Sequence, residues 1–126
     1  MKTVLALLLV ILGGCVQARD PQLIATTQSS DSALNCEQIA AEYKSNTEMA
    51  QSKIAKNHSD DQRELLLAIF VWPGLIDIKN SDGNEGNALL DRNIYLEGLA
   101  KGKSCPAVDA WPRQPERYSM IVDRIA

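Results

Sequence analysis

Two cysteines, Cys36 and Cys105, constrain the fold of this 126-residue chain more than any other feature. The chain begins with Met1-Lys2-Thr3 and nine apolar residues, 4–12, a pattern typical of a secretory signal and too short to span a bilayer. Because an exported protein enters an oxidising compartment, we expect Cys36 and Cys105 to form a disulfide. The alternative, a zinc site, would have only two cysteines and one histidine, with no paired ligand spacing.

The third cysteine follows the apolar run directly, in the motif Leu12-Gly13-Gly14-Cys15. Here the chain resembles bacterial lipoprotein precursors, in which small residues precede a cysteine that becomes the first mature residue and carries acyl chains such as palmitate. The resemblance implies a signal peptide over residues 1–14 and lipidation at Cys15. By the same resemblance, Val16 after the anchor favours the outer membrane, most simply its periplasmic face. The alternative is an ordinary signal peptide with a chance cysteine.

The segment after Cys15 is expected to be a tether. Residues 16–34 are rich in Gln, Ser, Thr and Ala and keep neither a helical nor a strand period. We therefore expect residues 15–34 to form a lipidated flexible tether, with a root-mean-square reach of about 25 Å. Residues 35–126 would form the folded domain. Leu23 and Ile24 could instead dock on that domain, so the order of this stretch stays open.

The domain is predicted to be all-α. A first helix is expected from Cys36 to about residue 57, with Ser32 or Asn35 as its cap. The capping-box pattern Ser59-Asp60-Asp61-Gln62 predicts the start of a second helical segment, which becomes apolar over residues 65–71. Trp72-Pro73-Gly74 should break or kink this middle segment, and residues 80–84 are a turn by composition.

A third helix is expected over residues 85–101, with Gly102 as its stop and with Leu90 and Ile94 widening its apolar stripe. A short amphipathic helix is expected after Pro115. A disulfide requires its two Cα atoms to lie within about 7 Å, so the first and third helices should be antiparallel. Closing a loop of about seventy residues should contribute roughly 4 kcal/mol to stability.

Residues 36–105 also resemble a group of small Gram-negative lipoproteins without assigned function. The resemblance rests on the motifs Cys36-Glu37-Gln38-Ile39, Trp72-Pro73, and Leu89, Arg92 and Tyr95-Leu96 ahead of Lys103 and Cys105. The tail from Pro106 onward lies outside the pattern. The resemblance implies no catalytic residues and no cofactor.

Composition and motifs argue against several functions. A pI of about 5.1 and 5% aromatic residues suit neither a nucleic-acid backbone nor a base-stacking surface. His58, the single histidine, has no recognisable nucleophile or orienting partner, so we expect an exposed loop residue without a catalytic or metal role. The acidic stretch 77–85 fails the calcium-loop spacing because Lys79 occupies its third position. We therefore expect no enzyme, metal or cofactor.

Arg92 lies on or beside the leucine stripe of the third helix. The favoured interpretation is an arginine at the helix edge that pairs with Glu42 or Glu48 across the hairpin. The alternative is a buried structural ion pair or a partner contact.

The apolar stretch 65–76 is the best functional candidate. A buried core segment is the favoured interpretation, and an exposed elbow led by Phe70 and Trp72 that contacts lipid or protein is the alternative. The mature chain has 12 basic and 16 acidic residues, a net charge of −4, so the polypeptide itself does not seek anionic lipid.

These features predict an outer-membrane lipoprotein that acts as a non-enzymatic interaction or assembly element of the envelope. Its partners would be the membrane, through the lipid, and an envelope protein. The alternative is a small periplasmic ligand-binding module or enzyme with a cleft at the Trp72-Pro73 elbow.

Overall fold

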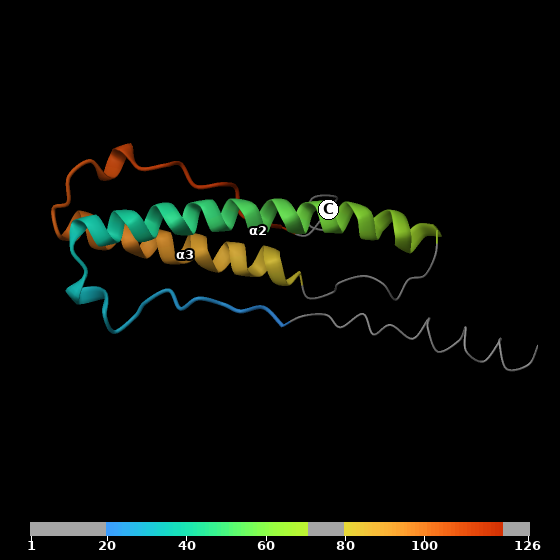
Figure 1. The fold of residues 1–126 in the computed structure, drawn as a ribbon, viewed down its shortest axis with the longest axis horizontal. Coiled ribbons are helices and arrows are strands. Elements are labelled where there is room, and N and C mark those ends of the chain that lie inside the picture. Colours follow the sequence, from blue (N-terminus) through green and yellow to red (C-terminus); the bar gives the residue numbers. More distant parts are fainter. Residues whose placement is uncertain (1–19, 71–79, 120–126) are drawn as a thin grey trace, which may run out of the picture.

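Two long helices, α2 (Cys36–Phe70) and α3 (Ser81–Gly102), form an antiparallel hairpin in the computed structural model (Figure 1). The structure describes residues 20–70 and 80–119, without the side chains of residues 61 and 63–70. Regular structure in these ranges is helical only, including two short 3-10 turns, η1 (Asp31–Ala33) and η2 (Val108–Ala110). The all-α prediction is therefore confirmed.

A disulfide closes one end of the hairpin. Cys36 begins α2, and Cys105 follows the end of α3, with 5.4 Å between their Cα atoms. The predicted bond is confirmed, and so is the antiparallel pairing of the first and third helices that it requires. We call this the disulfide end, and the opposite end, where α3 begins, the open end.

The helix α2 is longer than predicted. Its start is capped as expected, because the Asn35 side chain accepts from the Gln38 N–H while Gln38 accepts from the Asn35 N–H, both at 2.9 Å. Its predicted end near residue 57 is wrong, since the helix continues without a break to Phe70. Lys56 pairs with Asp60 one turn later, at 3.4 Å, which supports a continuous helix where a new start was expected.

The helix α3 begins earlier than predicted. Residues 81–84, expected to be a turn, form its first turn, and the Asn84 N–H donates to the Asn80 carbonyl at 2.9 Å. Asn80 adopts a left-handed conformation with φ of 45°, and the helix starts directly after it. Gly102 ends the helix as expected.

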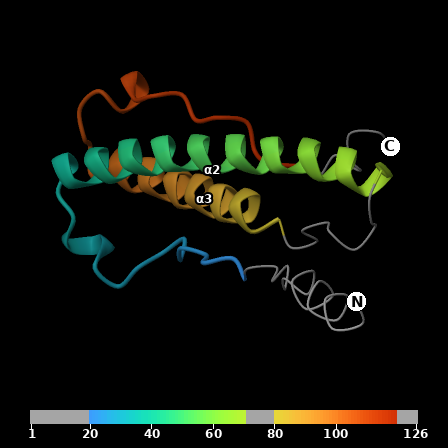
Figure 2. The same ribbon diagram turned by 45° about the vertical axis from the view of Figure 1, so that its right-hand side comes forward.

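Two extended straps run along the hairpin on opposite sides (Figures 1 and 2). The N-terminal strap comprises residues 20–35, and the C-terminal strap comprises residues 103–119. Ile24 packs on the apolar core, whereas Leu23 is 62% exposed, so docking of the predicted tether holds for Ile24 only. The amphipathic helix expected after Pro115 is absent over residues 115–119, and residues 120–126 lie outside the described part.

The core consists of two apolar clusters, one towards each end of the hairpin. Near the open end it is formed by Ala50, Ile54, Leu89, Leu90 and Tyr118. Near the disulfide end it is formed by Ile39, Tyr43, Leu96 and Ala100, covered by Trp111 and other half-buried side chains. Ile94, expected to widen the stripe, is 60% exposed. Each cluster includes strap residues, so the straps complete a core that two helices alone leave open.

Candidate functional site

Arg92 lies at the centre of a polar cluster and is fully buried, at 0% exposure. Its guanidinium binds Asp31 through two nitrogens, at 2.7 and 2.6 Å, and Glu42 through two, at 2.8 and 3.3 Å. A fifth bond, at 3.0 Å, goes to the carbonyl of Thr26. All five N–H donors of the side chain are thus used, which is the condition for burying an arginine without a large penalty.

The charges in this cluster stabilise one another. The hydrogen bonds from Arg92 hold the pKa of Asp31 below its ordinary value, and those to Asp31 and Glu42 raise the pKa of Arg92. The predicted pairing with Glu42 is confirmed, but the predicted place of Arg92 at the helix edge is wrong. Asp31 was missed because it belongs to a stretch without any periodic pattern. Only its sequence distance from Cys36, five residues before α2, hints that it can reach the helices.

A second polar layer lies beside Arg92 between the helices. The Asn93 amide donates to the Tyr43 carbonyl at 3.1 Å and to the Thr47 hydroxyl at 2.9 Å. The Thr47 hydroxyl donates in turn to the Tyr43 carbonyl. Together with the Arg92 cluster, this layer separates the two apolar clusters, and such buried polar contacts favour one register of the helices over shifted ones.

The open end joins the N-terminal strap to both helices. The buried carboxylate of Glu85 accepts from the Gln22 N–H at 2.6 Å and from the Lys53 ammonium. The Asn57 side chain accepts from the Gly83 N–H at 2.9 Å, which connects α2 to the first turn of α3. Three segments distant in sequence are therefore fixed to one another here.

The C-terminal strap reaches the same end from the other side. The Tyr118 N–H donates to Asn87 at 2.8 Å, and the Asn87 amide donates back to the Tyr118 carbonyl at 2.9 Å. The Tyr118 ring packs over Gly83 and lies 5.4 Å from the His58 ring, between centroids. His58 was expected in a loop, but it is half-buried within α2, because the two predicted helical segments are one.

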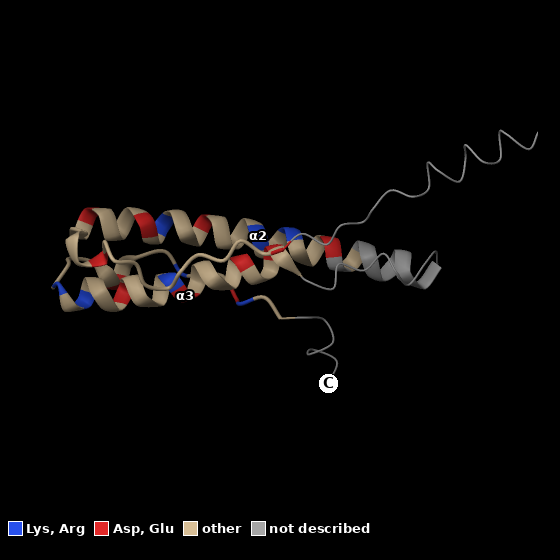
Figure 3. Ribbon diagram, turned by 90° about the horizontal axis from the view of Figure 1, so that it is seen from below, with Lys and Arg blue, Asp and Glu red and all other residues tan. Residues whose placement is uncertain are grey.

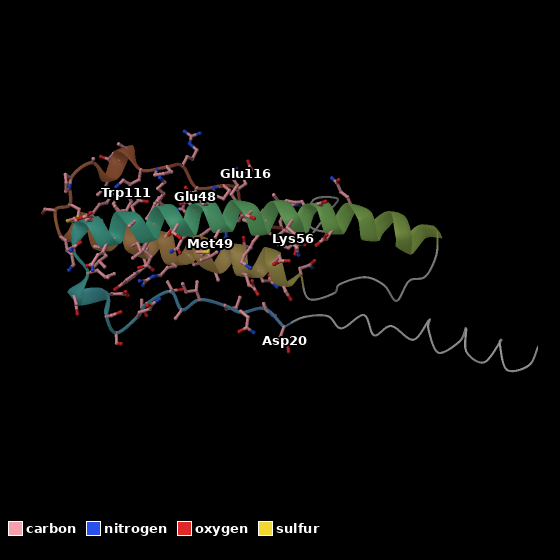
Figure 4. All side chains as sticks on the ribbon, viewed as in Figure 1. Asp20, Glu48, Met49, Lys56, Trp111 and Glu116 are labelled. Carbon is pink, nitrogen blue, oxygen red and sulfur yellow. A yellow bond between two sulfur atoms is a disulfide. The ribbon has the colours of Figure 1, made fainter. Side chains whose placement is uncertain are left out.

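Three ends of the described segments lie near the open end. Asp20 begins the N-terminal strap two residues before Gln22, which donates to Glu85. Asn80 precedes α3, and Ser119 follows Tyr118. The last part of α2, residues 58–70, extends past the start of α3 by about 20 Å (Figures 1 and 2). In Figure 4, Asp20 and Lys56 lie towards this end and Trp111 towards the disulfide end.

Acidic and basic residues both occur along the two helices. Figure 3 shows basic and acidic residues interspersed along the described parts of both helices. Among the described residues, no group of three or more His, Cys, Asp or Glu could hold a metal ion. The described helices include none long and apolar enough to cross a bilayer.

The other predicted site residues lie outside the described part of the chain. This holds for the lipidation site Cys15, for Trp72 and the elbow around it, and for the side chain of Phe70, the last residue of α2. The chain matches no protein-family model, no curated protein and no solved structure.

Proposed function

We propose that this protein is an outer-membrane lipoprotein, anchored by lipid at Cys15, that acts as a non-enzymatic interaction or assembly element of the cell envelope. The observation that carries the proposal is the disulfide between Cys36 and Cys105. A disulfide that closes the end of a helical hairpin is typical of a protein in an oxidising compartment, which supports export. It also uses two of the three cysteines, so Cys15 is left for the lipid.

The docked N-terminal strap supports a close attachment to the membrane. Only residues 16–19 separate the proposed anchor, Cys15, from Asp20, and the five chain steps between these two residues span about 17 Å when fully extended. The Arg92–Asp31 pair and the Glu85–Gln22 bond fix the rest of the strap on the helices. The domain would therefore sit close to the bilayer, with less freedom than a free tether of twenty residues gives.

The direction of the pKa shifts supports a structural rather than a catalytic role for the ionisable groups. Hydrogen bonds from arginine lower the pKa of Asp31 and of Asp91, and hydrogen bonds to carboxylates raise the pKa of Lys56 and of Lys101. A general acid or base works best with a pKa moved towards neutrality, and these four are moved away from it. Each of these shifts is caused first by a hydrogen bond to a side chain of opposite charge.

Lipidation is tested with Cys15→Ser, with the double variant Cys36→Ser/Cys105→Ser as the matched control. We expect Cys15→Ser to lose the acyl mass from its N-terminus and no longer to be held in the membrane fraction by acyl chains, while the control keeps both the lipid and the membrane attachment. A Cys15→Ser protein that still carries lipid would contradict the anchor.

The interaction role is tested by in-cell photo-crosslinking from Ile94 and Met49, the two exposed large apolar side chains on the described helices. A crosslinking residue placed at either position should give one adduct of defined mass with an envelope protein. The exposed residue Lys44 serves as the control position. Crosslinks that are absent at both sites, or no stronger than at Lys44, would contradict an assembly role.

A further inference from the structure

The open end of the hairpin gathers the proposed anchor and the most apolar part of α2. The strap that leads back to Cys15 is fixed beside Glu85, opposite Lys53 on α2. From there, the helix continues towards its tip, residues 65–70, and the disulfide lies at the far end. The anchor and the helix tip therefore extend from the same end of the molecule.

We propose that this end docks on the bilayer surface, with the α2 tip, residues 65–70, in the lipid interface. The inference rests on the lipid anchor of the proposed function and adds a second contact to it. The disulfide end would then point away from the membrane, and α3 would present Ile94 to the aqueous side for a partner.

Distances make this contact feasible. Residues 15–19 allow the anchor to lie up to about 17 Å from Asp20. The α2 tip lies about 12–20 Å along the helix from Asn57, the residue that holds the start of α3. The length from Asp20 to the anchor and the length from Asn57 to the tip are similar. One bilayer plane can therefore accept the acyl chains and the helix tip together.

The sequence of the tip suits lipid. Residues 65–70 (LLLAIF) are all apolar over more than one helical turn, whereas helices at a protein surface typically alternate apolar and polar residues. The turns just before, residues 59–64, are polar or charged, and Asp60 is exposed. This change from charged to apolar along one helix corresponds to a water–lipid boundary.

A lipid surface is favoured over another protein as the occupant. The anchor keeps the bilayer within reach at all times, which gives it a high effective concentration at the tip. Residues 59–64 carry more acidic than basic side chains, so attraction to anionic headgroups is not the cause. Apolar insertion should therefore be insensitive to salt and to headgroup charge.

The test measures depth with single tryptophans in the lipidated full chain, in vesicles of phosphatidylcholine with brominated acyl chains. The tip probe is Phe70→Trp combined with Trp72→Phe and Trp111→Phe. The matched control is Trp72→Phe alone, which leaves Trp111 near the disulfide end, against Tyr43. Melting curves of both proteins by circular dichroism establish that each is folded.

We expect bromine to quench the tip probe at least about threefold and to leave Trp111 unchanged, at low and high salt alike. A tip probe that is shielded from water but not quenched would mean that other parts of the chain or a protein cover the tip, and would overturn the proposal. Equal quenching at both positions would overturn the orientation.

A second measurement does not depend on the acyl anchor. In the Cys15→Ser chain, Leu67→Asp should lower binding to the same vesicles by about tenfold, whereas Ile94→Asp should not. Equal effects of the two substitutions would contradict tip insertion. Because lipidation is scored separately by mass, a lipidated protein with an unquenched tip overturns only this inference, and an unlipidated one overturns the proposed anchor.

Discussion

Arg92 and Asp31, 61 residues apart in the chain, form a bidentate ion pair with N–O distances of 2.7 and 2.6 Å, and both side chains are buried. The pair connects the strap that follows the proposed anchor to the middle of α3. Through Glu42 the same guanidinium also binds α2. One side chain thus holds three segments, and Asp31, which the sequence placed in a tether, is fixed on the helical hairpin.

Removal of this arginine should be strongly destabilising. Arg92→Met leaves the carboxylate of Asp31 buried without a cation, and we expect a loss of about 3–5 kcal/mol in the free energy of unfolding. Urea unfolding followed by circular dichroism measures it. The control is Arg117→Met, which breaks an exposed pair with Asp91 and should cost less than about 1 kcal/mol. Similar losses for the two variants would contradict the buried role of Arg92.

The Asp31 carboxylate should make stability depend on acid. Arg92 holds its pKa in the folded protein below the ordinary value of 3.8, so the native state favours the charged form. The stabilisation is therefore complete above about pH 4 and is lost as the pH falls through the lowered pKa. We expect the urea midpoints of wild type and Asp31→Asn to differ at pH 7 and to converge below pH 3.8. A constant difference down to low pH would show that the charge of Asp31 contributes nothing.

The sequence was sufficient to predict the pairing of the two helices and the end of α3. Two cysteines and the need for bridging distance were enough to predict antiparallel outer helices, and Gly102 marks the end of α3 correctly. The continuity of α2 was not predictable from Ser59-Asp60-Asp61-Gln62, because a capping pattern is also accommodated inside a helix when Asp60 pairs with Lys56. Local pattern alone does not separate these two cases.

The polar cluster was predictable only in part. Arg92 and Glu42 lie on helices whose pairing the disulfide fixes, so their contact follows from the topology. Asp31 and Gln22 lie in a stretch with no period, and their partners depend on where the strap packs. That packing is set by tertiary contacts, such as Ile24 on the apolar core, which no local signal encodes.

The disulfide should contribute substantially to stability. It closes a loop with a sequence separation of 69, and loss of this constraint should cost about 4 kcal/mol in the Cys36→Ser/Cys105→Ser variant. Non-reducing mass spectrometry should first show the two peptides linked in the exported protein. Urea unfolding with and without reductant then measures the contribution, and the double variant should not respond to reductant. Free thiols at both positions in the exported protein would contradict the bond.

The close packing of Tyr118 on Gly83 fixes the C-terminal strap at the open end. A Cβ atom at Gly83 would lie 2.4 Å from the Tyr118 ring, whereas a Cβ atom at Gly98, on the exposed side of α3, would meet nothing within 4 Å. Gly98→Ala should therefore stabilise the protein by about 1 kcal/mol through helix propensity alone. Gly83→Ala should destabilise it by about 1–3 kcal/mol because the ring must move.

A double variant measures the coupling between Gly83 and Tyr118. In a Tyr118→Ala background, the ring that clashes is gone, so Gly83→Ala should become neutral or slightly stabilising, and the two substitutions should be strongly non-additive. Thermal unfolding of the four proteins of this cycle measures the coupling. If Gly83→Ala is as harmful without the ring as with it, the strap does not pack on α3 as described, and the C-terminal segment would be held elsewhere.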